Sequence, residues 1–573
     1  MLSNGCERMP PLRVQPFHSL TYQRPDLHSI AERYRRARLR MRLAMKPESA
    51  IHAVEEAQAV SLEYHSSETL AGILFDLQTS GKDMREELLF FQRSAAEVAL
   101  MEQAFYQAMA ATRFRDALAE RFGERVFEVS AQLIETIQPS VTQELIDEQR
   151  LIGQYQQIIS RAVIHLDSQT LPLSDVQRLL VSADRPTRQL AWQAGTDWYV
   201  SHQDELDRIM DQLIKVRTGL SRKLGFNSFV PVAARRLQRS GNRSGDMAGL
   251  RELVRTYIVP LTREIRRLQR RRLGLDHLAP WDLMMMFPDG DPQTDRMNEN
   301  LPTLVAALAA DLTGQHPSLL QTLLEAGYVD WQERPGKRGD PSCRMIYEAG
   351  VPFIQINGCR TLQDIFSLLH ESGHAHAAWR SLSGMSVRRM HLPTADAAEL
   401  HAMAMEMLSH PYLDRLFGRE AETVTMLHMT RALLQVPADC MVDEFEYRIY
   451  AEPDLPAARR SQIWQELMAV YQPDLLAAED VQPELVFPWT MQALMVNRPF
   501  SSISKVTGQL SALDLWHQSR IQRGQALAIY DQLCAAGGQT DLPELLRQAG
   551  LQSPFERDTI KRLVYQICDF LSL

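Results

Sequence analysis

The helical spacing of the apolar residues constrains the fold of this chain more than any other feature. From about residue 27 to residue 270, nearly every segment repeats apolar residues at intervals of three or four positions, which places them on one face of an α-helix. Short breaks that contain Pro, Gly or Asn predict turns between the helices, at residues 138–140, 171–173 and 225–227. The pattern predicts a mainly α protein built from helix hairpins.

A single segment of the chain is typical of a strand. It runs from Arg344 to Ile356 and follows a polar loop at residues 334–342. Pro352 lies inside this segment and has no backbone N–H to donate to a neighbouring strand, so we expect the segment to lie at the edge of a small sheet. From Leu362 onward the pattern is helical again.

Length and charge narrow the class of protein. With 573 residues, the chain exceeds what one compact core usually organises, which predicts two or more lobes. A net charge of −9 argues against nucleic acid as the main partner. Two basic runs, Arg33 to Lys46 and Arg263 to Arg272, are interleaved with apolar residues at helical spacing, so we interpret them as solvated helix faces.

The cysteines and the hydropathy indicate the compartment. The six cysteines are widely scattered and form no CxxC motif, which favours reduced thiols over a disulfide framework. The first residues contain no apolar run after a basic stretch, and no window approaches the roughly 18 to 20 apolar residues that a membrane span needs. We therefore expect a cytoplasmic enzyme that does not span a membrane.

Two histidines lie four residues apart at the centre of a predicted helix, His370 and His374 in the sequence His-Glu-Ser-Gly-His. Thr361 and Asp364 provide a hydroxyl cap and an acidic first turn for this helix. The spacing places both imidazoles on one face, within reach of one metal ion, and Glu371 can reach a metal-bound water. Such a pentapeptide occurs by chance in about a percent of chains of this length, so the alternative is a surface helix with two idle histidines. The flanking residues are apolar, however, and histidines buried without partners would be costly.

A second apolar helix, predicted over residues 397–408, supplies two carboxylates. Glu399 and Glu406 lie seven residues apart and therefore on one face. Two carboxylates on an apolar helix require a cation or strong donors nearby. We predict one Zn²⁺ per chain, held by His370, His374 and Glu399 with one position open for water, and Glu406 accepting a ligand histidine N–H. Three further histidines are interpreted as surface or core residues: His376, His391 and His401.

This set of residues permits a hydrolytic mechanism. Zinc lowers the pKa of its water, and Glu371 accepts the proton as the resulting hydroxide attacks a carbonyl carbon. Glu371 then passes the proton to the leaving nitrogen. The reaction also requires a hydrogen-bond donor for the developing oxyanion.

These motifs resemble the oligoendopeptidase F and thimet oligopeptidase family of zinc metallopeptidases, specifically its bacterial oligoendopeptidase branch. Glu399 follows the first histidine of the motif by 29 residues, which is the spacing of that family. Similar segments are KLGFNSF at Lys223 to Phe229, PWDL at Pro280 to Leu283, YEAGVPFIQING at Tyr347 to Gly358, DEFEYRIY at Asp443 to Tyr450 and PFSSISKVTGQLSALDLW at Pro499 to Trp516. The resemblance covers roughly residues 150 to 570.

The resemblance implies a prolate, two-lobed, mainly α fold with a deep channel. A small edge sheet would lie beside the helix that carries His370 and His374, which we call the metal helix. Zinc would lie at the floor of the channel, which would admit short peptides and exclude folded proteins. Residues 1–150 would cap the channel, and residues 151–573 would form the zinc-binding catalytic region. In such a fold a peptide adds as a strand to the edge ahead of the metal helix. Here we expect that edge at Gly350 to Gln355, which makes Phe353 a candidate substrate contact.

One segment departs from the family pattern. Family members carry a His and several Tyr residues on a late helix, where they donate hydrogen bonds to the substrate carbonyl and the oxyanion. In this chain Leu494 stands in the place of the His, and Ser501, Ser502 and Lys505 stand in the places of the tyrosines.

Three interpretations therefore stay open. The first is a peptidase of altered specificity in which Tyr347, Arg498 or Lys505 donates in place of the missing groups. The second is a zinc enzyme that acts on a small amide or another metabolite. The third is a non-catalytic metal-binding protein, against which Glu371 argues, because a structural zinc site has no use for an acid beside an open position. The expected partner is a short peptide or a small amide, and the oligomeric state is not predicted.

Overall fold

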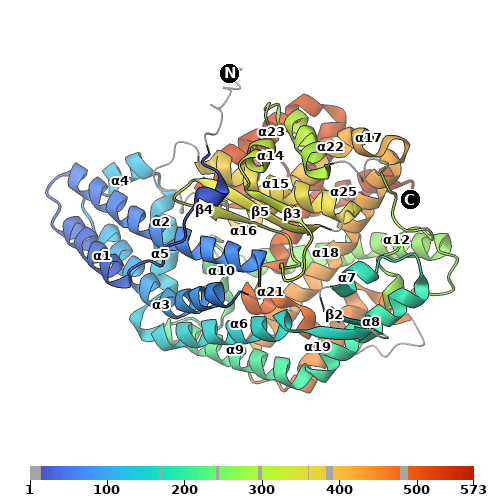
Figure 1. Cartoon of the computed structure of the whole chain (residues 1–573), viewed down its shortest axis with the longest axis horizontal. Coiled ribbons are helices and arrows are strands. Elements are labelled where there is room, and N and C mark those ends of the chain that lie inside the picture. Colours follow the sequence, from blue (N-terminus) through green and yellow to red (C-terminus); the bar gives the residue numbers. More distant parts are fainter. Residues whose placement is uncertain are drawn as a thin grey trace.

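Helices make up most of the computed structural model, as the apolar spacing predicts (Figure 1). The structure describes residues 14–79, 81–166, 169–173, 175–239, 244–294, 300–358, 361–382, 392–477 and 488–573. The longer helices ahead of the central sheet are α1 (Leu27–Arg42), α2 (Pro47–Leu77), α3 (Lys82–Ala110), α4 (Arg115–Phe122), α5 (Arg125–Thr136), α6 (Thr142–Ser160), α8 (Arg185–Ser201), α9 (Gln203–Lys223), α11 (Ser244–Leu253), α12 (Val259–Arg272) and α13 (Leu301–Thr313). Those that follow it are α15 (Leu362–Leu382), α16 (Ala395–Leu408), α18 (Ala421–Ala451), α19 (Ala457–Tyr471), α22 (Ser502–Ile521), α23 (Arg523–Ala536), α24 (Leu542–Ala549) and α25 (Arg557–Leu571).

Shorter helices complete the chain between these elements. They are α7 (Asp175–Leu179), α10 (Val230–Arg236), α14 (Leu319–Glu325), α17 (Asp414–Phe417) and α21 (Ala493–Asn497).

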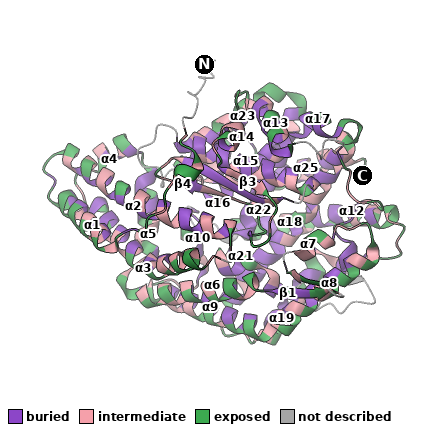
Figure 2. Ribbon diagram, in the orientation of Figure 1, coloured by how far each residue is buried: buried purple, intermediate pink, exposed green. Residues whose placement is uncertain are grey.

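Two large clusters of buried apolar side chains organise the molecule. One lies within α1 to α5 and includes Ile30, Tyr64 and Phe105. The larger one includes Ile73 of α2 and residues from Val141 to Ile567. In Figure 1 the helices α1 to α5 gather at one end of the elongated molecule, and Figure 2 shows buried residues along the inner faces of the helices. The arrangement agrees with the expectation of more than one lobe, and the boundary at residue 150 stays a prediction.

The predicted strand segment is divided between two antiparallel strands. These are β4 (Ser342–Ile346) and β5 (Val351–Gly358), and a third strand, β3 (Val329–Gln332), pairs in parallel with β5. The strand order is β3-β5-β4. The prediction that Gly350 to Gln355 form an edge is therefore wrong, because most of these residues belong to the central strand.

Pro352 fits a central strand because of the direction in which its backbone points. The N–H of Ile354 donates to the carbonyl of Tyr328 at 2.9 Å, on the β3 side. Backbone groups two residues apart point the same way, so the missing N–H of Pro352 also falls on the β3 side. There β3 has not yet begun, since its first paired residue, Val329, lies opposite Ile354. The proline removes no hydrogen bond from the sheet, and β4 is the edge strand next to the metal helix.

A second, two-stranded sheet lies where the apolar spacing predicts helices and a turn. β1 (Val163–Leu166) and β2 (Gln169–Pro172) form an antiparallel pair. Pro172 is thus the last residue of a strand, although residues 171–173 are predicted as a turn. Each strand has four residues, which is too short for an alternating pattern to stand out.

A half-buried arginine on β4 joins the edge strand to α2. The guanidinium of Arg344 forms an ion pair with Asp76 of α2. It also lies against Gly72, where an added Cβ would be 2.5 Å from Nη1 of the arginine. Nearby, the hydroxyl of Ser66 accepts the backbone N–H of Glu348 at 2.8 Å. Helix α2, which contributes to the smaller core, therefore contacts the strand that borders the metal helix.

A buried carboxylate lies where α18 meets the start of α22. Glu446 is 1% exposed, and both of its oxygens accept the N–H of Phe500 at 2.9 Å. Phe500 has a φ of 61°, which is unusual for a residue other than glycine, and the hydrogen bond helps to hold that conformation. Burial raises the pKa of Glu446 to about 8; the Phe500 N–H opposes the rise and Asp443 adds to it.

The raised pKa of Glu446 predicts that stability falls as the pH rises. Between the ordinary pKa of 4.5 and about 8, the folded chain keeps a proton that the unfolded chain has lost. The stabilising contribution of this proton is complete below the ordinary pKa and is lost as the pH rises through the folded value. Glu446→Gln retains the shape of the side chain and cannot titrate. Its melting temperature should decline less than that of the wild type between about pH 6 and pH 9, as measured by scanning fluorimetry, and equal declines would contradict the assignment.

Candidate metal centre

The metal helix α15 begins at a reciprocal cap. The hydroxyl of Thr361 accepts the N–H of Asp364 at 3.2 Å, and the carboxylate of Asp364 accepts the N–H of Thr361 at 2.8 Å. Residues on the inner side of the helix, such as Phe366 and Leu369, are buried. The predicted helix start is confirmed, and the packed side of α15 fixes the direction in which its histidines project.

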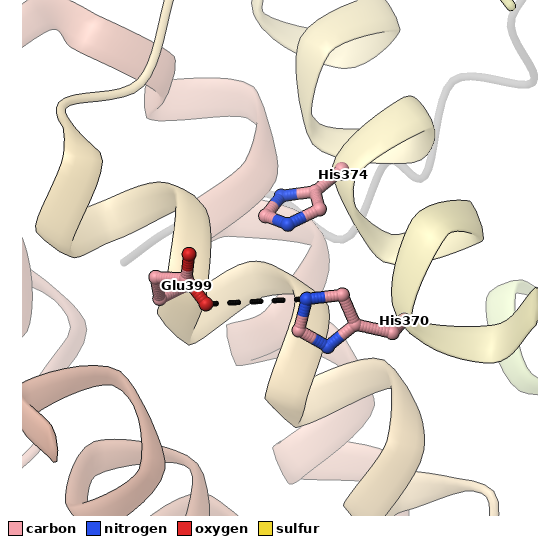
Figure 3. A group of neighbouring side chains, drawn as sticks. All are labelled: His370, His374 and Glu399. Carbon is pink, nitrogen blue, oxygen red and sulfur yellow. Dashed lines mark ion pairs between the residues drawn. The ribbon is translucent and has the colours of Figure 1, made fainter. Parts of the chain in front are cut away.

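Three side chains from two helices converge in a group that can hold a metal ion (Figure 3). His370 and His374 project from α15, and Glu399 projects from α16. One candidate ligand atom from each residue lies within 4.8 Å of the other two, and Nε2 of His370 is 3.9 Å from Oε2 of Glu399. This carboxylate oxygen is buried and accepts no hydrogen bond from the described residues, as expected of an atom that binds a cation. Imidazole nitrogens and a carboxylate oxygen are donors that suit zinc.

Two glycines allow α16 to approach its neighbours closely. Gly373 of α15 faces α16, where an added Cβ would be 2.7 Å from Cα of Ala402 and 2.8 Å from the carbonyl oxygen of His401. On the other side, an added Cβ at Gly508 of α22 would be 2.7 Å from Cβ of Glu399. Contacts this short leave no room for a side chain. The position of Glu399 relative to the two histidines is therefore set by glycine contacts on both sides of its helix.

A buried ion pair fixes the first turn of α16. The guanidinium of Arg239 donates to the carboxylate of Asp396 at 2.9 Å and to the hydroxyl of Ser504 at 2.8 Å. The hydroxyl of Ser504 in turn donates to Asp396 at 2.6 Å. Ser504 belongs to α22, so this network ties α16 to α22 near Glu399.

Glu406, the predicted partner of a ligand histidine, contacts two histidines. Its Oε1 lies 2.7 Å from Nδ1 of His370, which leaves Nε2 of His370 to face the metal position. Its Oε2 lies 2.8 Å from Nε2 of His428 on α18. Burial alone would raise the pKa of Glu406. The contacts with the two histidines outweigh burial, and the pKa is lowered to about 2. The carboxylate is therefore ionised at neutral pH.

The electrostatics of the group favour a cation. Burial alone would lower the pKa of His370. The hydrogen bond to Glu406 and the charges of the three neighbouring carboxylates outweigh burial, and the pKa is raised to about 9. In contrast, burial and the neighbouring His370 hold the pKa of His374 well below its ordinary value. Three carboxylates beside two imidazoles leave an excess of negative charge that a divalent ion would neutralise.

Glu371 lies beside this group and is 7% exposed. Burial raises its pKa to about 7; the charge of His370 opposes this, and the charges of Glu399 and Glu406 add to it. The backbone N–H of Cys343, on β4, donates to the Glu371 carboxylate. A carboxyl group that titrates near neutral pH suits a role as both proton acceptor and proton donor.

Two cationic candidates from the departing segment act electrostatically, one on the metal group and one on a carboxylate beside it. Arg498 is exposed. Its charge helps to lower the pKa of His374, although burial and the neighbouring histidines lower that pKa more. Lys505 of α22 acts on Asp439 of α18, a carboxylate that no sequence motif marks. Burial raises the pKa of Asp439 to about 6, while the charge of Lys505 lowers it and that of Glu399 raises it.

The remaining replaced positions supply no donor of the family type. Leu494 lies in α21, and Ser501 precedes α22 with its hydroxyl buried and without a hydrogen bond in the described part of the chain. Ser502 is buried at the start of α22.

The other two candidate substrate contacts differ in their surroundings. Tyr347 is half-buried and directly follows β4. Phe353 is 2% exposed, and its ring packs 4.5 Å from that of Phe17. It borders a cavity of about 650 Å³ whose lining, as far as the chain is described, includes Phe17 and Val329 but no residue of the metal group. Phe353 therefore belongs to the core, because β5 is central, and its interpretation as a substrate contact is not supported.

The neighbouring histidines occupy the core. His376 and His401 are buried, and burial lowers the pKa of each to about 4. Both are core residues, as interpreted from the sequence. His391 lies outside the described residues.

His428 and Cys343 are site residues that sequence reasoning missed. Each reaches the group from an element far along the chain, without a local motif to mark it.

Among the described helices, none is long and apolar enough to cross a membrane.

Comparisons with known proteins identify the family. The model of Peptidase family M3 matches residues 178–565, and the model of the Peptidase M3 N-terminal domain matches residues 17–137. A comparison with curated proteins finds no significant match. Among solved structures, PZ peptidase A with an inhibitor is 27% identical, with a TM-score of 0.92 over 97% of this chain and 99% of that one. A protein assigned as oligoendopeptidase F is 28% identical, with a TM-score of 0.92 over 97% of this chain and 99% of that one.

A further structure, assigned as an oligoendopeptidase F from Bacillus anthracis, is 27% identical, with a TM-score of 0.89 over 97% of this chain and 98% of that one. These similarities extend over nearly the whole length of each protein, and the match to the main family model covers more than half of this chain. The chain belongs to Peptidase family M3.

Proposed function

We propose that this chain is a zinc-dependent peptidase that hydrolyses short peptides. His370, His374 and Glu399 would hold one zinc ion, and Glu371 would act as the catalytic base. The observation that carries the proposal is the convergence of three ligand atoms within 4.8 Å, beside a buried carboxyl group, in a chain of a peptidase family.

The residues divide the chemistry among them. Bound zinc would supply a Lewis acid that lowers the pKa of a water ligand and polarises the scissile carbonyl. Glu371 would take the proton from the attacking water and return it to the leaving nitrogen. Its pKa of about 7 allows both steps near neutral pH, and the charge of a bound cation would shift this value downward. Glu406 would keep His370 oriented through Nδ1.

A peptide would bind along β4. Cys343 pairs with Ile354 of β5, whose N–H points toward β3, so the backbone groups of Cys343 point away from β5. One of these groups donates to Glu371. Met345, two residues further along, points the same way. A substrate strand added at this edge would therefore lie beside the catalytic carboxyl group.

Arg498 and Lys505 are the proposed donors to the substrate carbonyl in place of the family's His and Tyr. Both are cationic, and both act on residues of the metal group or its neighbour Asp439. A preorganised cation at a developing oxyanion can replace a neutral hydrogen-bond donor. Tyr347, after β4, is a third candidate.

Metal content and peptide turnover test the proposal. The purified protein should contain about one zinc per chain, measured by mass spectrometry, and His374→Ala should lose it. Quenched fluorescent peptides should be cleaved by the wild type, and a chelator should stop cleavage until zinc is restored. A properly folded wild-type protein without metal affinity would refute the zinc site.

A second candidate function, hydrolysis of a small amide, rests on one observation. Residues 494–507 contain neither His nor Tyr, so the usual donors to a peptide carbonyl are absent. Full zinc occupancy without cleavage across a broad peptide library, together with turnover of small amides, would favour this candidate over peptide hydrolysis.

A further inference from the structure

A line of buried side chains continues beyond Glu406, away from the metal group. Oε2 of Glu406 is 2.8 Å from Nε2 of His428, and Nδ1 of His428 is 2.9 Å from Nε2 of His410. With His370, this makes four side chains in a row, each within hydrogen-bond distance of the next. None of the mechanism above uses His428 or His410.

The positions of the protons along this line follow from its two ends. A histidine nitrogen that binds a metal carries no proton, so His370 must carry its proton on Nδ1 and donate it to Glu406. The ionised carboxylate of Glu406 can only accept, so Nε2 of His428 must donate to its second oxygen. In a neutral His428, Nδ1 is then an acceptor, and it receives the N–H of His410. Burial holds the pKa of His410 well below its ordinary value, which is consistent with a neutral ring there.

The packing holds His428 in this orientation. Its ring stacks on that of Phe366, with centroids 3.8 Å apart and an interplanar angle of 8°. Phe366 is on α15, one turn before His370, whereas His428 is on α18. His428 is 8% exposed and His410 is 7% exposed. The ring of His428 therefore lies between Phe366 of the metal helix and Glu406, and it has little freedom to rotate.

We propose that His428 is a positioning residue of the metal centre. By donating to the second oxygen of Glu406, it fixes the plane of that carboxylate, and the other oxygen then fixes the rotation of His370 toward the metal. His410 completes the line by fixing the ring of His428 from behind. This inference rests on the proposed zinc site and adds a third layer of support, contributed by α18, to a centre whose ligands come from α15 and α16.

The alternative is that His428 only fills space in the core. Two substitutions distinguish the roles. His428→Phe retains the ring that stacks on Phe366 and removes the N–H donor. His428→Gln loses the ring and provides an amide N–H at the position of Nε2. A space-filling role predicts that Phe is tolerated better than Gln, whereas a positioning role predicts the reverse.

The experiment measures metal binding first and activity second. Zinc affinity is determined by competition with a chelating dye, and the ligand geometry is followed by the visible absorption of the Co²⁺-substituted protein. Loss of the direct partner of a ligand histidine typically weakens metal binding or activity 10- to 100-fold. Because His428 acts one step further out, through Glu406, we expect a loss of zinc affinity at the lower end of that range in His428→Phe, about tenfold. The Co²⁺ spectrum should change in this variant. In His428→Gln, the affinity should stay within about threefold of the wild type, with an unchanged spectrum.

The steady-state constants provide a further readout. Because His428 does not contact substrate in this proposal, His428→Phe at saturating zinc should lower kcat and leave KM unchanged. Circular dichroism and the melting temperature of the metal-free proteins report whether each variant folds. If the Phe variant does not fold, His428→Leu serves as the donor-free variant.

The outcomes separate the two proposals. A wild-type protein that binds no zinc defeats the proposed function itself. A wild-type protein that binds zinc, together with a folded donor-free variant of equal affinity and equal Co²⁺ spectrum, defeats the positioning role alone. Weaker binding in His428→Gln than in His428→Phe also defeats it. Weakened binding in the donor-free variant, restored by Gln, supports it.

Discussion

Glu371→Gln should lower kcat about 10²- to 10⁴-fold while the protein retains its zinc. The amide has the shape of the carboxyl group but cannot accept a proton from the attacking water. Glu371 is not among the three candidate metal ligands, so metal content should not change. Turnover of quenched fluorescent peptides, measured alongside zinc content by mass spectrometry, checks both parts of the expectation.

A matched control for this substitution lies on the surface of α14. Glu325 is exposed, and Glu325→Gln makes the same chemical change away from the metal group. It should cleave peptides at the wild-type rate. If Glu371→Gln retained most of the wild-type turnover at full zinc occupancy, another residue would have to be the base.

The second large effect should come from Gly508→Ala. The added methyl group would be 2.7 Å from Cβ of Glu399 and 2.8 Å from the backbone nitrogen of Leu400. Because backbone atoms cannot turn away as a flexible side chain can, α16 and α22 must separate. Overpacking of this kind costs about 1–3 kcal/mol of folding stability. It should also displace Glu399 from the histidines and weaken zinc binding about tenfold or more.

Gly219→Ala provides the comparison for Gly508→Ala. Gly219 lies inside α9, and an added Cβ there would have no atom within 4 Å. Alanine is favoured over glycine within a helix by about 1 kcal/mol, so this variant should be as stable as the wild type or slightly more stable. Melting temperatures and zinc affinities of the two variants are compared. Equal behaviour of the two would contradict the close packing at Glu399.

The features of the metal centre that could be predicted from the sequence are local ones. The cap at Thr361 and the spacing of His370 and His374 lie within one helix, and Glu399 and Glu406 share a face of another. In each case the periodicity of the α-helix determines which side chains point together. The sequence also predicted Glu406 as a partner of a ligand histidine, because such a histidine requires a partner for its other nitrogen, and Oε1 of Glu406 lies 2.7 Å from Nδ1 of His370.

The features that could not be predicted depend on pairing between distant elements. Pro352 favours an edge strand by composition, but its place in the sheet depends on where β3 begins relative to β5. The contacts of Glu406 with His428 and of Gly508 with Glu399 join helices that are separated along the chain. A single sequence contains no periodic signal for such contacts.

The contact of Arg344 with Gly72 and Asp76 has a consequence for how this molecule can change during evolution. Arg344 lies on β4 next to Cys343, whose backbone N–H donates to Glu371. Gly72 and Asp76 lie on α2, a helix that contributes to the smaller core. Suppose the amino-terminal helices were exchanged with those of a relative. If position 72 were not glycine, its side chain would press against the guanidinium of Arg344, and if position 76 were not acidic, the guanidinium would lose this partner. The two regions recognised by separate family models are thus tied at β4. They are expected to be inherited together, and a chimera should need the pair at 72 and 76 to travel with the arginine at 344.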